Sequence, residues 1–117
     1  NRPESVKNII NEIKKFSKIS MADCASINDV NNALKSGVDI IGTTLSGYTK
    51  NKIPKYPDLK LLRQSINLNI PVIAEGRFNT PLLAKKAINL GAHSVVVGTA
   101  LNRVELITKN FVKKINE

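Results

Sequence analysis

Four short apolar runs recur along this chain and constrain its fold more than any other feature. They occupy residues 19–22, 38–42, 72–74 and 95–97. Their apolar residues follow one another instead of alternating with polar ones, which is typical of strands buried on both faces of a parallel sheet. The stretches between the runs carry apolar residues at helical spacing. We therefore predict an α/β fold in which helices and parallel strands alternate.

Five helices are expected around these four strands. Apolar positions repeat at helical spacing within residues 6–16, 59–66, 83–90 and 106–115, and a further helix is expected to end at Gly37. Asp58, and Thr80 followed by Pro81, are suited to start helices, because a side-chain oxygen caps the first N–H groups and proline fits the first turn. Gly37 and Gly91 are suited to end helices, where a left-handed residue is commonly needed.

An internal sequence repeat favours a barrel over an open sheet. Residues 33–37 (ALKSG) followed by 41–43 (IGT) resemble residues 87–91 (AINLG) followed by 97–99 (VGT), with two residues inserted. Such a repeat is expected of two βα units in one repetitive fold. A (β/α)8 barrel is the favoured interpretation, and a Rossmann or flavodoxin-like open sheet is the alternative. Because a complete barrel needs about 250 residues, these 117 residues are expected to form part of one.

The composition indicates the cellular compartment of the protein more clearly than its function. The net charge is +9, and the lysines fall mainly on expected helix faces and one loop, without interleaved aromatic residues. We interpret them as solvated charges, with an acidic partner or nucleic acid as the alternative. The single cysteine, Cys24, and the lack of metal-ligand spacing favour a reducing cytoplasm and no metal. With no apolar run near roughly 18 residues and no signal-peptide pattern at residues 1–10, we expect a soluble protein without membrane association.

Two carboxylates follow apolar runs directly and are candidates for chemistry. Asp23 comes after residues 19–22, and Glu75 comes after residues 72–74. The carboxyl ends of barrel strands carry the active site, and partial desolvation there suits a carboxylate to acid–base work. Glu75 is the stronger candidate. Asp23 is equally suited to cap the helix that begins near Ser26.

Two glycine turns are candidates for a phosphate site. Gly76 and Arg77 follow the third strand, and Gly98 and Thr99 follow the fourth. Backbone N–H groups at such turns bind phosphate, and in many barrels the phosphate lies on the loops after strands seven and eight. The alternative is two ordinary tight turns.

The remaining features carry weaker signals. Residues 43–57 form the longest stretch without periodicity, and we interpret it either as a substrate loop or as a disordered surface loop. Arg103 is positioned to contact an anion or to pair with Glu105. His93 precedes the last strand and so is expected at the wrong end of a barrel for catalysis. Cys24, without a partnering histidine, is interpreted as a buried, inert thiol.

Four strings resemble the N-acetylmannosamine-6-phosphate 2-epimerase family in order and spacing. They are MADCAS at 21–26, GVDIIGTTLSGYT at 37–49, PVIAEGRFNTP at 71–81 and GAHSVVVGTALNRVELITKNFV at 91–112. The resemblance implies one domain, residues 1–117, that is the C-terminal half of a (β/α)8 TIM barrel and lacks strands one to four. It also implies a cytoplasmic isomerase of sialic-acid catabolism that moves the C2 proton between N-acetylmannosamine 6-phosphate and N-acetylglucosamine 6-phosphate, without a metal or nucleotide cofactor.

The resemblance also assigns roles to residues of this sequence. In the family a glutamate of the AEG motif and a lysine from an early strand form the acid–base pair, so Glu75 takes the first role and Asp23 binds sugar hydroxyls or orients the lysine. The other implied contacts are substrate binding by Thr43, Thr44, Tyr48 and Arg103, and phosphate binding by Gly76, Arg77, Gly98 and Thr99. No segment matches the family's catalytic lysine, so the isolated chain is predicted to be inactive.

Two other functions compete with this one. A non-catalytic half-barrel would bind sugar phosphates or self-associate, because four βα units leave two open sheet edges. A different phosphate-binding barrel, of the thiazole or tryptophan biosynthesis families, is disfavoured by GTTLSGYT. The partners expected are a small sugar phosphate and further copies of the chain, with no specific nucleic acid.

Overall fold

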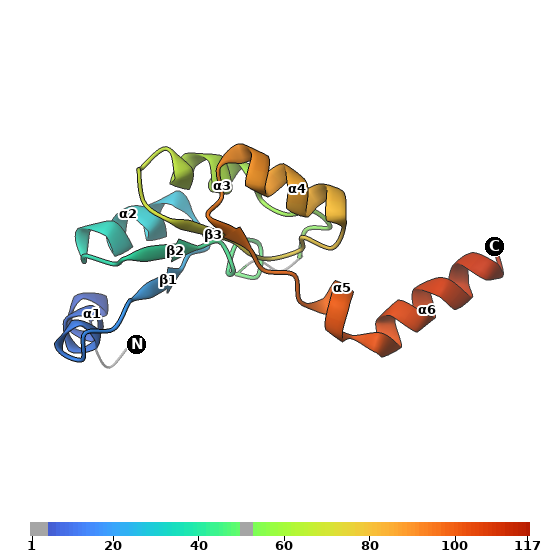
Figure 1. Ribbon diagram of the computed structural model, residues 1–117, viewed down its shortest axis with the longest axis horizontal. Helices are drawn as coiled ribbons and strands as arrows, with labels where there is room; N and C mark the ends of the chain where they lie inside the picture. The colour runs from blue at the N-terminus through green and yellow to red at the C-terminus, as the bar shows by residue number, and fades with distance from the viewer. Residues whose placement is uncertain (1–4, 50–52) are drawn as a thin grey trace.

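One parallel sheet and its flanking helices make up the computed structural model of this chain, which describes residues 5–49 and 53–117. The strands pair in the order β1-β2-β3-β4. They are β1 (Met21–Asp23), β2 (Ile40–Gly42), β3 (Val72–Ala74) and β4 (Ser94–Val95). The described helices are α1 (Val6–Lys15), α2 (Ile27–Lys35), α3 (Leu59–Ile66), α4 (Pro81–Leu90), α5 (Thr99–Asn102) and α6 (Val104–Ile115) (Figure 1).

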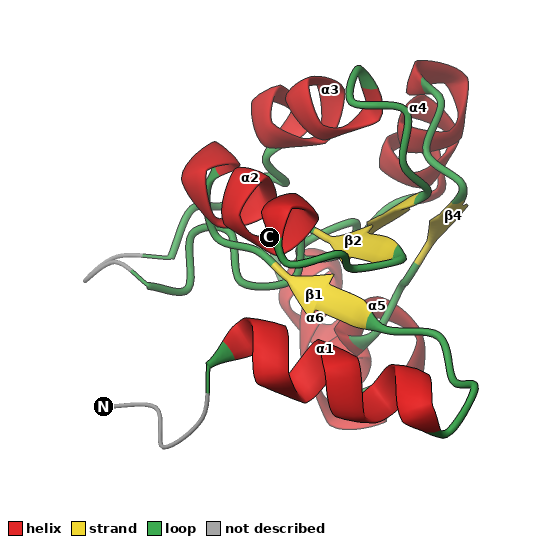
Figure 2. Ribbon diagram, turned by 90° about the vertical axis from the view of Figure 1, so that its left-hand side faces the viewer, coloured by secondary structure: helices red, strands yellow, loops and turns green. Residues whose placement is uncertain are grey.

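The strand order and the placement of the helices distinguish a barrel from an open sheet. Strands that are consecutive in sequence are neighbours in the sheet, and all three pairings are parallel. Helices α2, α3 and α4 lie together over one face of the sheet (Figure 1), and α1 lies beside β1 (Figure 2). A doubly wound sheet places helices on both faces and reverses its strand order, whereas a barrel does neither. The predicted half of a (β/α)8 barrel is therefore confirmed, and the open-sheet alternative is wrong.

The core lies between the sheet and these helices. Ile41 and Val72 of the strands and Val30 and Leu62 of the helices are fully buried. Ile41 is paired with Val72 across the ladder, so both side chains point to the helix-covered face. The next positions, Asp23, Gly42 and Ile73, therefore point to the opposite face.

The predicted helix ends are confirmed. The side chains of Asp58 and Thr80 accept hydrogen bonds from the first turns of α3 and α4. Gly91 ends α4 with a φ of 106°, and Gly37 follows the end of α2 with a φ of 83°. Ser26, and not Asp23, caps α2, so the capping role considered for Asp23 is wrong.

Three of the four strands differ from the expected runs. The first is Met21–Asp23 instead of 19–22, so Ile19 lies outside it and is 74% exposed. The second is Ile40–Gly42 instead of 38–42, and the fourth is Ser94–Val95 instead of 95–97. A parallel strand extends only as far as its partner runs alongside, which apolarity alone does not specify. The part of the chain that the structure describes has six helices instead of five, because the one-turn helix α5 precedes α6.

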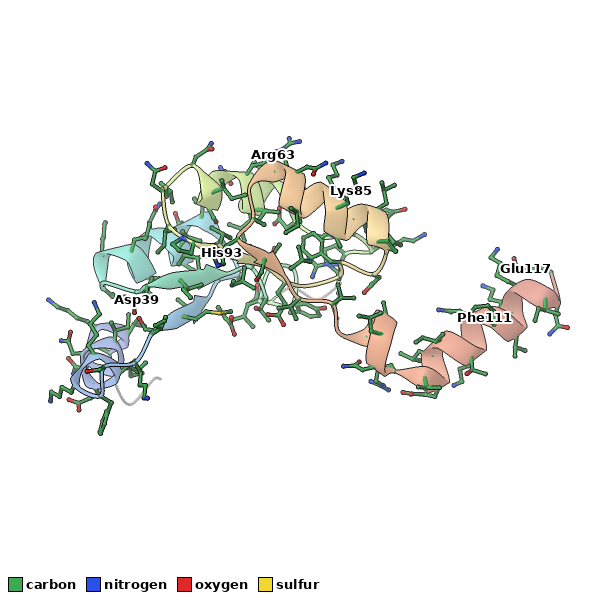
Figure 3. The ribbon with its side chains drawn as sticks, viewed as in Figure 1. Asp39, Arg63, Lys85, His93, Phe111 and Glu117 are labelled. Atoms are coloured by element: carbon green, nitrogen blue, oxygen red, sulfur yellow. The ribbon has the colours of Figure 1, made fainter. Side chains whose placement is uncertain are left out.

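The C-terminal helix extends away from this body. α6 contains no buried residue, and the chain measures 55 × 32 × 28 Å along its principal axes. Figure 3 shows Phe111 on this projecting helix, far from the sheet. None of the described helices is long and apolar enough to cross a membrane.

Candidate functional site

A pocket of about 380 Å³ lies where β2, β3 and β4 end at their carboxyl ends. Its lining consists of Thr44, Leu45, Tyr48, Glu75, Gly76, Arg77, Phe78, Asn79, Val96, Gly98 and Thr99. Seven of the ten residues predicted to form the site are among them. Asp23, Thr43 and Arg103 are not. The loops after three consecutive strands thus converge on one place, as the parallel arrangement requires.

Thr44 joins the two candidate carboxylates. Its hydroxyl lies 2.9 Å from Oε2 of Glu75 and 3.0 Å from Oδ1 of Asp23. The sheet register explains this arrangement, because Gly42 is paired with Asp23 on one side and with Ile73 on the other. Two residues further along, the chain places Thr44 beside Glu75. Asp23 therefore belongs to the site through Thr44, although it does not line the pocket.

Gly42 provides the space for this cluster. A Cβ atom at this position would lie 2.8 Å from Oδ1 of Asp23 and 2.6 Å from Cε of Met21. With any larger residue at this position, the side chains of Asp23 and Met21 would have to shift.

Thr43 holds the backbone of Glu75 instead of facing the pocket. Its hydroxyl donates to the carbonyl of Glu75 at 2.9 Å and accepts from the N–H of Glu75 at 3.0 Å. The residue is buried, with 3% of its surface exposed. The proton of the hydroxyl is already donated to Glu75, and the predicted contact of Thr43 with substrate stays a prediction.

Arg77 binds the loop that follows β2. Its guanidinium donates to the carbonyls of Ser46 at 2.6 Å and Tyr56 at 2.9 Å, and it lies over the ring of Tyr48, 5.1 Å from the centroid. The backbone of Arg77 adopts a φ of 64°, an uncommon conformation for a residue with a side chain. The side chain of Arg77 is therefore directed to the loop. The predicted contact of this turn with phosphate would be made by its backbone.

The described parts of this loop, residues 43–49 and 53–57, are tied to the sheet and to α3. Ser46 donates a hydrogen bond of 2.8 Å to Asp58, the cap of α3. Burial on its own would raise the pKa of Asp58, but hydrogen bonds from Leu61, Ser46 and the Lys60 backbone, together with nearby Arg77, lower it overall. These contacts favour an ordered loop over a disordered one in these parts, and the substrate role stays a prediction. Residues 50–52 of the predicted loop lie outside the described residues.

The glycine turns are open toward the pocket. Gly76 adopts a φ of 96°, which favours glycine. Gly98 precedes α5, and a Cβ atom added to it would meet no atom within 4 Å. In the part of the chain that the structure describes, no side chain caps α5. Phosphate binding at these turns stays a prediction.

Three residues outside the pocket were also singled out from the sequence. Arg103 lies between α5 and α6, is exposed, and pairs with Glu105, as the alternative interpretation expected. His93 lies at the amino end of β4, away from the pocket (Figure 3). Cys24 is buried as predicted, and burial, followed by Asp29 and Asp23, raises the pKa of its thiol to about 11. Within residues 5–49 and 53–117, no group of three or more potential ligands could hold a metal ion.

Sequence reasoning missed the structural partners of the site. Ser46 and the carbonyl of Tyr56 give no sequence signal, because backbone acceptors are invisible in composition. Phe78 and Asn79 line the pocket and could have been found, since they directly follow the turn at Gly76.

Comparisons with known proteins show which family the chain is similar to. The family model described as "Putative N-acetylmannosamine-6-phosphate epimerase" (NanE) matches residues 1–117. Two proteins named "Putative N-acetylmannosamine-6-phosphate 2-epimerase" are similar to this chain. That of Vibrio vulnificus is 48% identical over 94% of this chain and 49% of its own length. That of Proteus mirabilis is 41% identical over 96% of this chain and 48% of its own length. The solved N-acetylmannosamine-6-phosphate 2-epimerase from Clostridium perfringens has a TM-score of 0.88 and 43% identity, over 97% of this chain and 51% of the other. The chain spans about half the length of the curated relatives it matches.

Proposed function

The chain belongs to the N-acetylmannosamine-6-phosphate epimerase family, and we propose that it forms the sugar-phosphate pocket of an enzyme that epimerises N-acetylmannosamine 6-phosphate at C2. The product of this reaction is N-acetylglucosamine 6-phosphate. The observation that carries the proposal is the pocket itself, in which the half-buried carboxylate of Glu75 lies beside two open glycine turns.

In this proposal Glu75 exchanges a proton with C2. Moving a proton beside a carbonyl or masked carbonyl carbon requires a base on one face of the sugar and an acid on the other. Glu75 is the titratable carboxylate of the pocket lining, and its backbone is fixed by Thr43. Phosphate bound at the turns containing Gly76 and Gly98 would supply the energy that positions C2.

Among the residues that the structure describes, the lining of this pocket contains no lysine to serve as the second acid–base group. We propose that this group comes from outside the 117 residues, and that the 117-residue chain alone does not catalyse epimerisation.

A second candidate function is a non-catalytic sugar-phosphate module that self-associates. In the described part of the chain β1 pairs only with β2, and β4 pairs only with β3, so both edges of the sheet are open. Open edges and exposed apolar residues favour association with another copy. Light scattering would give a mass above 12.8 kDa for the 117-residue chain if it does so.

The test compares three versions of the complete gene product. Conversion of N-acetylmannosamine 6-phosphate is followed by proton NMR for the wild type, for Glu75→Gln, and for Glu12→Gln as a control on the exposed face of α1. We expect Glu75→Gln to lower kcat by about 10²- to 10⁴-fold, the usual contribution of a general acid–base group, and Glu12→Gln to leave it unchanged. A wild type that binds the sugar phosphate without converting it would favour the non-catalytic module.

A further inference from the structure

The carboxylate of Glu75 has one side-chain donor within the described residues, and that donor is Thr44. The hydroxyl of Thr44 contacts Oε2 of Glu75 at 2.9 Å. Oε1 of Glu75 makes no hydrogen bond or ion pair with any described residue. The two oxygens of this carboxylate are therefore inequivalent before any substrate arrives.

Asp23 holds Thr44 from the other side. Its Oδ1 atom lies 3.0 Å from the same hydroxyl, and no other described side chain donates to this carboxylate. A hydroxyl carries a single proton, so Thr44 donates to one carboxylate at a time. The orientation of its hydroxyl thus couples Asp23 to Glu75, although the two carboxylates belong to different strands.

We propose that Thr44 is a positioning residue that fixes the carboxylate of Glu75 and leaves Oε1 as the oxygen that takes the C2 proton. This role rests on the function proposed above. The terminal torsion of a glutamate is broad, so an unrestrained carboxylate samples many orientations. The bond from Thr44 restricts this torsion. Asp23 acts on Glu75 through Thr44, because its carboxylate competes with Glu75 for the single proton of that hydroxyl.

The neighbouring residues support a built arrangement. Thr43 fixes the main chain of Glu75 while Thr44 fixes its side chain, so two consecutive hydroxyls act on one glutamate. Gly42 leaves the space that Asp23 occupies, since a Cβ atom there would lie 2.8 Å from Oδ1 of that carboxylate. Displacement of a catalytic group by about 1 Å can cost about 10²-fold in rate, so this alignment bears on catalysis.

The test uses Thr44→Val, which removes the hydroxyl at nearly constant shape, and Thr44→Ser, which keeps it. In the complete gene product, Thr44→Val is expected to lower kcat by about 10- to 100-fold with KM changed by less than about threefold, because alignment of the base is lost and substrate binding is not. Thr44→Ser is expected to keep kcat within about threefold of the wild type. Equal kcat values for the wild type and Thr44→Val, or equal losses in both variants, would overturn the proposal.

A second readout does not depend on turnover. With ¹³C-labelled carboxyl groups in the same protein, Thr44→Val is expected to move the carboxyl resonances of both Asp23 and Glu75, whereas Thr44→Ser moves neither appreciably. Movement of one resonance alone, or of neither, would contradict the coupling. If the wild type does not epimerise the sugar phosphate, the proposed function fails, and these resonances still decide whether Thr44 joins the two carboxylates.

Discussion

Three consecutive residues at the end of β2 act on the candidate carboxylates in three different ways. Gly42 leaves space for Asp23, Thr43 fixes the backbone of Glu75, and Thr44 contacts both carboxylates. The sequence predicts that the two threonines lie near the pocket, because they directly follow a strand. It does not separate the two threonines, since their roles depend on which face of the sheet each side chain takes.

At the opposite end of the same strands, Asp39 is predicted to make stability depend on acid pH. Oδ2 of Asp39 accepts from the hydroxyl of Ser20 at 2.6 Å and from its N–H at 2.8 Å, which lowers the pKa of Asp39. A lowered folded-state pKa contributes stability that is present above about pH 4 and is lost as the pH falls through the folded value. Figure 3 shows Asp39 beside the first strand, away from the pocket.

The measurement is urea unfolding of the 117-residue chain between pH 7 and pH 3. Asp39→Asn is expected to be less stable than the wild type at pH 7, and the difference is expected to shrink as the pH falls below 4. Glu12→Gln, on the exposed face of α1, serves as the control. A difference between wild type and Asp39→Asn that stays constant across this range would refute the assignment.

At the scale of elements, the sequence predicts what local chemistry determines. The caps at Asp58 and Thr80 and the left-handed Gly91 were all identified correctly, because each depends on neighbours within a few residues. The start of β1 and the separate helix α5 were not identified. The start of β1 depends on how far β2 runs alongside it, which the sequence does not encode locally.

The loop after β2 is predicted to depend on Arg77. Both tyrosines of the chain, Tyr48 and Tyr56, lie in this loop, and the chain contains no tryptophan. Near-ultraviolet circular dichroism of the 117-residue chain therefore reports on the loop. Arg77→Lys keeps the charge but cannot donate to two carbonyls from a planar group, so we expect a weaker tyrosine signal and a loss of roughly 1–2 kcal/mol in unfolding free energy.

Arg63→Lys is the matched control for this experiment. Arg63 lies on α3 and points away from the loop (Figure 3). We expect this variant to keep both the tyrosine signal and the stability of the wild type. An undiminished signal in Arg77→Lys would show that the loop is held by other contacts.

At the scale of the whole molecule, the structure is a layer of helices on one face of a sheet with two open edges. α6 buries no residue, and its exposed apolar side chains are Val104, Leu106, Phe111, Val112 and Ile115. Removing residues 104–117 from the 117-residue chain is therefore expected to change the free energy of unfolding by no more than about 0.5 kcal/mol. Urea unfolding at low protein concentration measures this difference. A loss of several kcal/mol would mean that α6 packs against the body or against another copy.

The half-barrel architecture was predictable from the alternation of strands and helices and from the repeated βα unit. The sequence could not predict the sequential strand order or the placement of helices on one face, because an open α/β sheet has the same alternation. The structure shows both. The pocket followed from the same topology, since parallel strands end at one side. The contacts of Arg77 with Ser46 and Tyr56 could not be predicted from the topology, because they join segments that are distant in sequence.

The central claim, that Glu75 exchanges a proton with C2 of the sugar phosphate, is tested most directly by isotope incorporation. The complete gene product and its Glu75→Gln variant are incubated with N-acetylmannosamine 6-phosphate in deuterium oxide, and the C2 hydrogen is followed by NMR. We predict deuterium at C2 with the wild type and none above background with Glu75→Gln. Epimerisation without deuterium incorporation, or equal incorporation by both proteins, would contradict the account.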